Sequence, residues 1–489
     1  MGKQKALDIE QELIRIPIGS IEFLNNDNLR YLQPKKAFYL NNDGAFEYRY
    51  DIEVICPRLE EIIKDSMYFK FVKDSNLGST FIYVYRGGYY QLMSETEFKG
   101  MIVDYIPSQI RRSKDVDEVF KLLLMENDYY IDNSELNSDY KYINFKNGLL
   151  NLETMELESH TPDKFFTVQI PVCYKRLDEC KRGTLFEKYL GELVDDDEIM
   201  KECLLEAMGL VLSNIPGYLT KKAILMIGPK DCVKTQIKKL LTLLLGIKYT
   251  SSIELSKMST NNFATSELYN KRLAGSNDMQ YTAVADMGIF KQLTGGDPIS
   301  VEFKGRGAFS YVFTGLLWFL ANDFPKFSGK KEDAVYQRFV VIPCEHVVKT
   351  EDQDPELVNK MLRESEYIVS LCINSLLKLI DRKYKFPESE RMINGLKKYE
   401  VSNNTLLQFV EECCDIIDDL SPTERMKVST FKKDYQIWCR DSGVKNMALK
   451  NDDIENYLKP KYGTEVIKSS NYYVSNIKLK DDISFSFTN

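Results

Sequence analysis

Residues 223–235 read AILMIGPKDCVKT, a short apolar run that passes directly into a loop with glycine and proline. The five apolar residues Ala223–Ile227 have the length of a buried strand, and such continuous runs are typical of parallel sheets. An apolar stripe at helical spacing follows the loop, formed by Ile237, Leu240, Leu241 and Leu244. The sequence therefore predicts a buried strand, a loop and a helix.

The loop fits the spacing of a phosphate-binding loop at every defined position except one. Gly228, Lys234 and Thr235 stand where the pattern has its first glycine, its lysine and its hydroxyl residue. This chemistry needs backbone N–H groups at a helix N-terminus, an ammonium group to counter phosphate charge, and a hydroxyl to hold Mg²⁺. Val233 stands where the second glycine belongs. Valine disfavours positive φ, so either the loop keeps a helical geometry there or phosphate approach is compromised.

Further apolar runs at residues 315–321 and 339–342 predict two more buried strands, and together they predict an α/β core of roughly residues 185–350. Helical periodicity covers residues 185–212 and 395–417. We expect five parts: an N-terminal α+β domain (1–140), a helical collar or linker domain (141–215), the core with the loop (216–350), a helical connector (351–420) and a winged-helix-like domain (421–489).

The composition is that of an ordinary globular chain. Hydrophobic residues make up 44% and charged residues 28% of the 489 positions, which is too apolar for extended disorder and enough for about three domains. The apolar runs fall far short of the roughly 20 residues that span a bilayer, and no signal core opens the chain, so we expect a cytoplasmic protein without a membrane segment. Ten cysteines without a Cys-x-x-Cys pair and only two histidines favour free thiols over a zinc site.

The net charge of −8 means that a nucleic-acid site must come from a local basic patch. Residues 421–480 contain twelve Lys and Arg against seven Asp and Glu, a local balance of +5. With Trp438, Tyr472 and Tyr473, this patch predicts a winged helix that binds duplex DNA, with its second helix near residues 452–458 in the major groove. A solvated helical lid with lysine-rich faces is the alternative.

From about residue 147 to residue 346 the chain resembles the superfamily 3 DNA helicases of the phage and plasmid helicase-primase type, whose relatives include the poxvirus nucleoside triphosphatase. Ordered segments carry the resemblance: the start at residues 147–152 with His160 and Pro162, the loop, a Walker B-like segment (271–278), a superfamily 3-like motif (291–297), a sensor-like strand (320–325) and an arginine-finger-like strand (337–343). The resemblance implies a P-loop AAA+-like ATPase core.

The resemblance implies catalytic roles for three residues. Asp278 would help bind Mg²⁺ or polarise the attacking water, although Asn277 stands where the family usually has an acid. Asn322 would orient water at the γ-phosphate, and Arg338 would reach the nucleotide of a neighbouring subunit. The structural alternatives are a turn aspartate, a turn cap and a surface arginine.

The resemblance also implies a DNA-contacting hairpin. Lys304 and Arg306 would line a central channel and contact phosphates of single-stranded DNA, whereas charged hairpin tips are also common on ordinary surfaces. The roles of Lys291 and Asp297 stay open between the subunit interface and the fold.

The function that these features predict is an ATP-dependent replicative helicase and replication initiator of a phage or phage-related mobile element. Its cofactors would be ATP and Mg²⁺, and its partners single-stranded DNA, duplex origin DNA, further copies in a homo-oligomer (a hexamer) and a separate primase. A ring-forming DNA-binding scaffold with weak or absent hydrolysis is the alternative, because Val233 and Asn277 depart from the family pattern. A P-loop motor outside replication is a third reading, which residues 295–297 and the basic tail disfavour.

Overall fold

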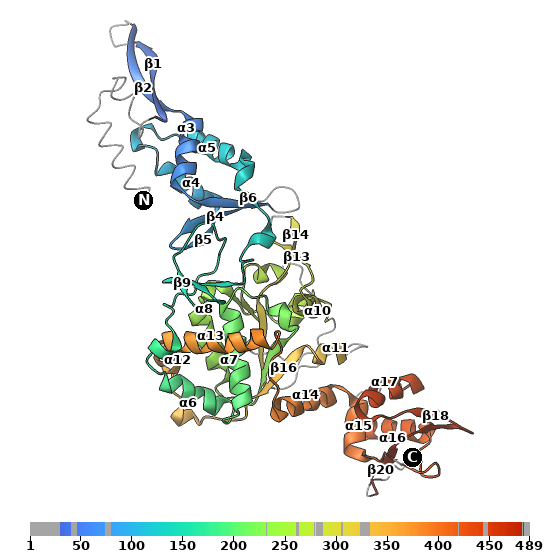
Figure 1. The fold of residues 1–489 in the computed structure, drawn as a ribbon. Coiled ribbons are helices and arrows are strands. Elements are labelled where there is room, and N and C mark those ends of the chain that lie inside the picture. Colours follow the sequence, from blue (N-terminus) through green and yellow to red (C-terminus); the bar gives the residue numbers. More distant parts are fainter. Residues whose placement is uncertain are drawn as a thin grey trace.

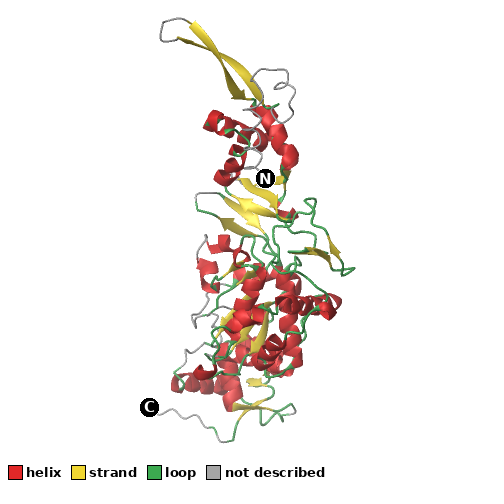
Figure 2. Cartoon of the chain, turned by 90° about the vertical axis from the view of Figure 1, so that its left-hand side faces the viewer, coloured by secondary structure: helices red, strands yellow, loops and turns green. Residues whose placement is uncertain are grey.

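The computed structural model describes residues 30–40, 46–73, 80–230, 232–260, 264–277, 279, 287–304, 307–322, 333–418, 420–443, 448–481 and 483. Figure 1 shows an N-terminal unit, a central core and a C-terminal unit following one another along the molecule. In Figure 2 the helices of the core surround its central strands, and the strands of the N-terminal sheet lie above them.

The N-terminal unit mixes helices and strands. A four-stranded sheet has the order β5-β4-β3-β6 and packs on α3 to α5 through a shared apolar core, and an antiparallel hairpin of β1 and β2 precedes them. The elements are β1 (Leu32–Leu40), β2 (Phe46–Val54), α3 (Cys56–Ser66), β3 (Phe69–Lys73), β4 (Thr80–Arg86), β5 (Tyr89–Met93), α4 (Glu95–Val103), α5 (Ser113–Met125) and β6 (Tyr130–Ile131).

Residues 141–215 combine a small sheet with two helices. The elements are β7 (Tyr142–Phe145), β8 (Gly148–Asn151), β9 (Leu157–Glu158), α6 (Thr184–Leu193) and α7 (Glu198–Leu212). Their buried side chains share one apolar cluster with β10 and the helix after it. This stretch is therefore part of the central core and contains strands as well as helices.

The core is built on five parallel strands in the order β11-β12-β15-β10-β16. They are β10 (Ala223–Ile227), β11 (Thr250–Ser251), β12 (Leu273–Ala274), β15 (Leu316–Ala321) and β16 (Phe339–Pro343). The strands predicted at residues 223–227, 315–321 and 339–342 are confirmed, and every residue of β10 is buried. Ile227 pairs with Ala321 on one side and with Pro343 on the other, so the ends of three strands lie together.

Both faces of this sheet are covered, which explains the continuous apolar runs. Side chains alternate between two apolar clusters: Ile224 and Met226 face the cluster with α7, α8 and α13, whereas Leu225 and Ile227 face the cluster with α9, α10 and α14. The remaining core elements are α8 (Lys234–Leu245), α9 (Leu255–Thr260), α10 (Gly288–Gly295), β13 (Ile299–Glu302), β14 (Ala308–Tyr311), α11 (Asp333–Tyr336), α12 (Leu357–Leu362), α13 (Ser365–Asp381) and α14 (Glu390–Asn403).

The C-terminal unit has the order helix, strand, two helices and three strands. Its elements are α15 (Thr405–Cys413), β17 (Cys414–Ile416), α16 (Val428–Asp441), α17 (Asn451–Tyr462), β18 (Val466–Lys468), β19 (Tyr472–Val474) and β20 (Ile477–Leu479). Strand β17 pairs with β20 and β18 pairs with β19, both antiparallel. Helix α15 shares the apolar cluster of this unit, so the cluster begins before residue 421.

The helix predicted across residues 395–417 is wrong in two places. Helix α14 ends before Asn404, whose side chain accepts hydrogen bonds from the N–H groups of Leu406 and Leu407 and starts a new helix. Residues Cys414–Ile416 then form a strand. Local side-chain capping and sheet pairing override the apolar periodicity here.

Within the described ranges, no helix combines the length and the apolar character that crossing a lipid bilayer requires.

Candidate nucleotide site

The loop after β10 lies at the carboxyl edge of the parallel sheet, between the ends of β15 and β16. The N–H of Gly228 donates to the Ala321 carbonyl at 3.3 Å, and the N–H of Cys344 donates to the Ile227 carbonyl at 2.7 Å. A Cβ on Gly228 would lie 1.9 Å from the Cys344 carbonyl oxygen, so only glycine fits this approach. The sequence pattern and the packing therefore require the same glycine.

Lys234 brings the loop and the sensor-like strand together. Its buried Nζ donates to the carbonyls of Gly228 and Pro229 and to Oδ1 of Asn322, each at 2.9 Å. Asn322 directly follows β15, and Thr235 is half-buried in the first turn of α8. Gly228, Lys234, Thr235 and Asn322 thus gather at one place.

Val233 precedes α8 in the left-handed conformation, with φ 51° and ψ 1°. Of the two alternatives that the valine left open, the helical geometry does not hold, because the backbone takes the left-handed conformation that a glycine would adopt. Among the described non-glycine residues with positive φ, only Val233 has a β-branched side chain. Strain of this kind costs about 1–3 kcal/mol.

The Walker B-like segment is partly described. Leu273 and Ala274 form the buried strand β12 beside β15, and Asn277 is exposed after it. Asp278 lies outside the described residues, so its predicted contact with Mg²⁺ stays a prediction.

Lys238, which the sequence analysis did not single out, ties this segment to α8. Its Nζ donates to the carbonyls of Gly275 (2.5 Å), directly after β12, and of Trp318 (2.8 Å), within β15. Burial lowers the pKa of Lys238 to about 7. Its position one helical turn after Lys234 is the sequence signal that could have found it.

Arg338 lies at the amino ends of the parallel strands, whereas the loop lies at their carboxyl ends. It precedes β16, whose first residue Phe339 pairs with Ala223 at the start of β10. The Arg338 Nη1 donates to the Lys291 carbonyl at 3.1 Å and to the Thr294 hydroxyl at 2.9 Å, in the last turns of α10. The structure therefore does not bring Arg338 to Lys234 of the same chain.

Gly296, directly after α10, has a structural role. Gly296 ends the helix with φ 79°, and a Cβ on it would lie 2.8 Å from the Tyr218 ring. This packing explains a glycine at position 296.

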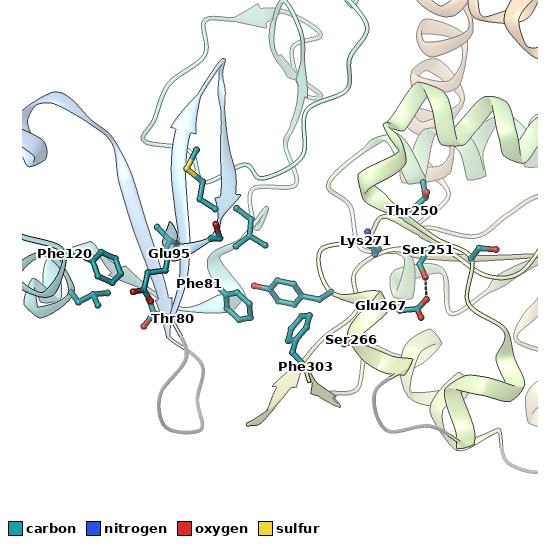
Figure 3. Close-up of a pocket in the computed structure, with 17 residues that line it drawn as sticks. Thr80, Phe81, Glu95, Phe120, Thr250, Ser251, Ser266, Glu267, Lys271 and Phe303 are labelled. Carbon is teal, nitrogen blue, oxygen red and sulfur yellow. Dashed lines mark hydrogen bonds between the residues drawn. The ribbon is translucent and has the colours of Figure 1, made fainter. Parts of the chain in front are cut away.

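The hairpin of β13 and β14 places Lys304 in an exposed turn, while Arg306 lies outside the described residues. Phe303, which directly follows β13 at the turn end of the hairpin, packs on the N-terminal unit, since its ring lies 5.8 Å from the Phe81 ring of β4. Figure 3 shows these two rings at a cavity of about 1170 Å³ between the N-terminal sheet and the core. The N-terminal unit thus helps to hold the hairpin.

Two smaller cavities flank the loop. One of about 340 Å³ is lined by Thr235, Val233 and Tyr189 of α6. The other, of about 660 Å³, is lined by Gly228 and Asn322 and, from α14, by Arg391 and Lys398. Arg391 pairs with Asp195 at 2.7 Å and with Glu345 at 3.3 Å. The α14 residues come from a distant part of the chain.

Across the described ranges, which omit Asp278, no group of three or more His, Cys, Asp or Glu side chains is arranged to hold a metal ion. Trp438, assigned to DNA binding from the sequence, is buried in the C-terminal unit and its indole N–H donates to Glu412 at 3.0 Å. That assignment is wrong, because the ring is part of the apolar core.

Two family models match the chain. Residues 77–195 match the family described as D5 N terminal like, and residues 226–338 match a family of unknown function, DUF5906. The first match runs from β4 to the loop after α6 and so crosses the boundary expected near residue 140. It supports a protein of phage replication.

Solved structures with a similar chain include two A form apo structures of the NrS-1 C terminal region, one of them described as residues 305–718. Both share 12% sequence identity with this chain, at a TM-score of 0.47, and the match covers 86% of this chain and 98% or 99% of the other.

Proposed function

We propose that this protein is an ATP-dependent replicative DNA helicase and replication initiator of a phage or related mobile element. One observation carries the proposal: Lys234 Nζ donates a hydrogen bond of 2.9 Å to Asn322 Oδ1. This bond lies beside Gly228, at the carboxyl ends of the parallel strands. Ligands of open α/β sheets bind at this edge. The resemblance to superfamily 3 helicases and the D5 N terminal like match support replication as the setting.

ATP and Mg²⁺ fit the residues present. Helix α8 begins at the loop and offers its first N–H groups to an anion. Three partners of Lys234 Nζ are oxygen atoms, which phosphate oxygens can replace, and the fourth is Cys232 Sγ at 3.6 Å. Thr235 and Asp278 would hold Mg²⁺, which when bound neutralises phosphate charge, and Asn322 would orient a water molecule.

A ring explains the position of Arg338. Because it lies at the amino edge of its own sheet, we infer that it serves the nucleotide site of a neighbouring subunit in a hexamer. Lys304 and Arg306 would then contact single-stranded DNA in the central channel.

The C-terminal unit is proposed to bind duplex origin DNA as a winged helix, through its β18–β19 hairpin. Lys468 and Tyr472 lie at the hairpin turn, both are exposed, and the Lys468 ammonium is 5.7 Å from the Tyr472 ring centre. The first turn of α17 carries Asp452 and Asp453, which would repel phosphates. The hairpin is therefore favoured over α17 as the contact.

A ring-forming scaffold with little hydrolysis is the second candidate function. Two observations favour it: the strained Val233 and the exposed amide Asn277 in place of an acid. Under this reading the loop binds nucleotide for assembly, and Val233→Gly would create turnover that the natural chain lacks.

The test is steady-state ATP hydrolysis with and without single-stranded DNA. We expect DNA-stimulated turnover in the natural chain and a loss of about 100-fold or more in Lys234→Ala. Lys239→Ala is the matched control, because Lys239 is an exposed lysine of the same helix. Turnover no higher than that of Lys234→Ala, in protein that still binds DNA, would contradict the helicase reading and leave the scaffold.

A further inference from the structure

The carbonyl of Val233 has a partner on a distant helix. It accepts a hydrogen bond from the Tyr189 hydroxyl at 3.0 Å, in addition to the N–H of Gln236 at 3.0 Å within the first turn of α8. Tyr189 lies on α6, more than forty residues away in the chain. The hydrogen bond that joins α6 to the loop is therefore accepted by Val233, the residue that stands where the loop pattern has its second glycine.

Tyr189 is rigidly placed for this contact. The side chain is 3% exposed and its ring belongs to the main apolar cluster together with Phe186 and Leu190 of the same helix. Burial raises the pKa of the Tyr189 hydroxyl well above its usual value, so the group stays protonated and donates. A buried hydroxyl that loses its partner is costly, which makes the bond persistent.

The direction of the Val233 carbonyl decides the direction of the next N–H. In a trans peptide the carbonyl oxygen and the following N–H point to opposite sides. Holding the Val233 oxygen toward α6 therefore turns the N–H of Lys234 away from α6. A glycine would reach this backbone conformation without help, whereas a valine resists it.

We propose that Tyr189 is a positioning residue of the nucleotide site, which holds Val233 in the left-handed conformation that a glycine would otherwise supply. This inference rests on the proposed function. We call the hydrogen bond from Tyr189 the brace of Val233; because of it, the loop can keep its nucleotide-binding conformation although valine replaces glycine. It assigns a role at the site to α6, outside the residues that match the loop pattern.

A cycle of four full-length proteins tests the proposal: the natural chain, Tyr189→Phe, Val233→Gly and the double variant. The readout is affinity for a non-hydrolysable ATP analogue with Mg²⁺, measured by titration calorimetry. We expect Tyr189→Phe to weaken binding about tenfold in the valine protein and less than about twofold in the glycine protein, because glycine no longer needs the brace. An equal loss in both backgrounds would overturn the proposal.

Tyr249→Phe is the matched control. Tyr249 is also 3% exposed, lies in the same apolar cluster and donates its hydroxyl to one backbone carbonyl, that of Thr167, at 2.9 Å. We expect it to leave nucleotide affinity unchanged. A tenfold loss in this control would show that affinity follows general core stability, and would also overturn the proposal.

Two measurements distinguish failure of the proposed function from failure of the proposed role of Tyr189. If the natural chain binds no nucleotide, the nucleotide site is contradicted, and the brace is measured by hydrogen exchange of the Lys234 and Thr235 amides in the same four proteins. We expect Tyr189→Phe to speed exchange at least about fivefold more in the valine protein than in the glycine protein. Equal acceleration in both would reject the brace independently of nucleotide.

Discussion

At the scale of single residues, Glu206 of α7 is a carboxyl group with no exposure to solvent. It pairs with Arg382, while its Oε2 has no hydrogen-bond partner among the described residues. Burial raises the pKa of Glu206 from an ordinary 4.5 to about 7. The folded state therefore binds this proton more tightly than the unfolded state does.

This shift predicts a pH dependence of stability. The folded-state pKa is raised, so the contribution of Glu206 is fully present below pH 4.5 and is lost as pH rises toward about 7. Relative to Glu206→Gln, the natural chain should lose on the order of 2–3 kcal/mol of unfolding free energy across this window. Urea unfolding of both proteins from pH 4.5 to pH 8 checks this, and parallel curves would contradict it.

Sequence spacing identified part of the candidate site and missed the rest for a physical reason. Gly228, Lys234 and Thr235 follow from a local pattern, since the roles proposed for them depend on one loop and the helix after it. Tyr189 and Arg391 reach the same place from α6 and α14. Such tertiary contacts leave no trace in the spacing of either segment.

At the scale of elements, burial on both faces made the sheet predictable, because β10, β15 and β16 are continuous apolar runs. The two-residue strands β11 and β12 are too short to carry a pattern. The break at Asn404 was missed because an asparagine inside an apolar periodicity marks a cap only once its side-chain bonds are known.

The β18–β19 hairpin yields a prediction for DNA binding. Lys468→Ala should weaken duplex binding about three- to tenfold and lower the slope of log affinity against log salt by about one, since one phosphate contact is lost. Fluorescence anisotropy over a salt series measures both. Lys461→Ala is the control, because Lys461 is paired with Glu411 at 2.8 Å. Equal effects of the two variants would argue against the hairpin as the contact.

At the scale of the whole molecule, the proposed function places each nucleotide site between two chains. The loop and Arg338 lie at opposite edges of one sheet, so a complete set of catalytic groups would need two subunits. Two inactive variants should therefore restore each other when they assemble together.

Mixing Lys234→Ala with Arg338→Ala in equal amounts should give about a quarter of natural turnover, because about one interface in four joins an intact loop to an intact arginine. Each variant alone should be inactive. Thr294→Val keeps the arginine but removes its hydroxyl partner within the chain, and should retain turnover within about threefold. A mixture as inactive as its components would contradict sharing.

Helix α14 starts at the cavity beside the loop, with Arg391 in its first turn, and meets α15 of the C-terminal unit at its other end. It has 14 residues, which makes it about 21 Å long. As a stiff rod of that length, it would convert a tilt of about 5° at the cavity into a displacement of about 2 Å at its far end. Helix α14 therefore forms a continuous mechanical connection between the cavity beside the loop and the C-terminal unit.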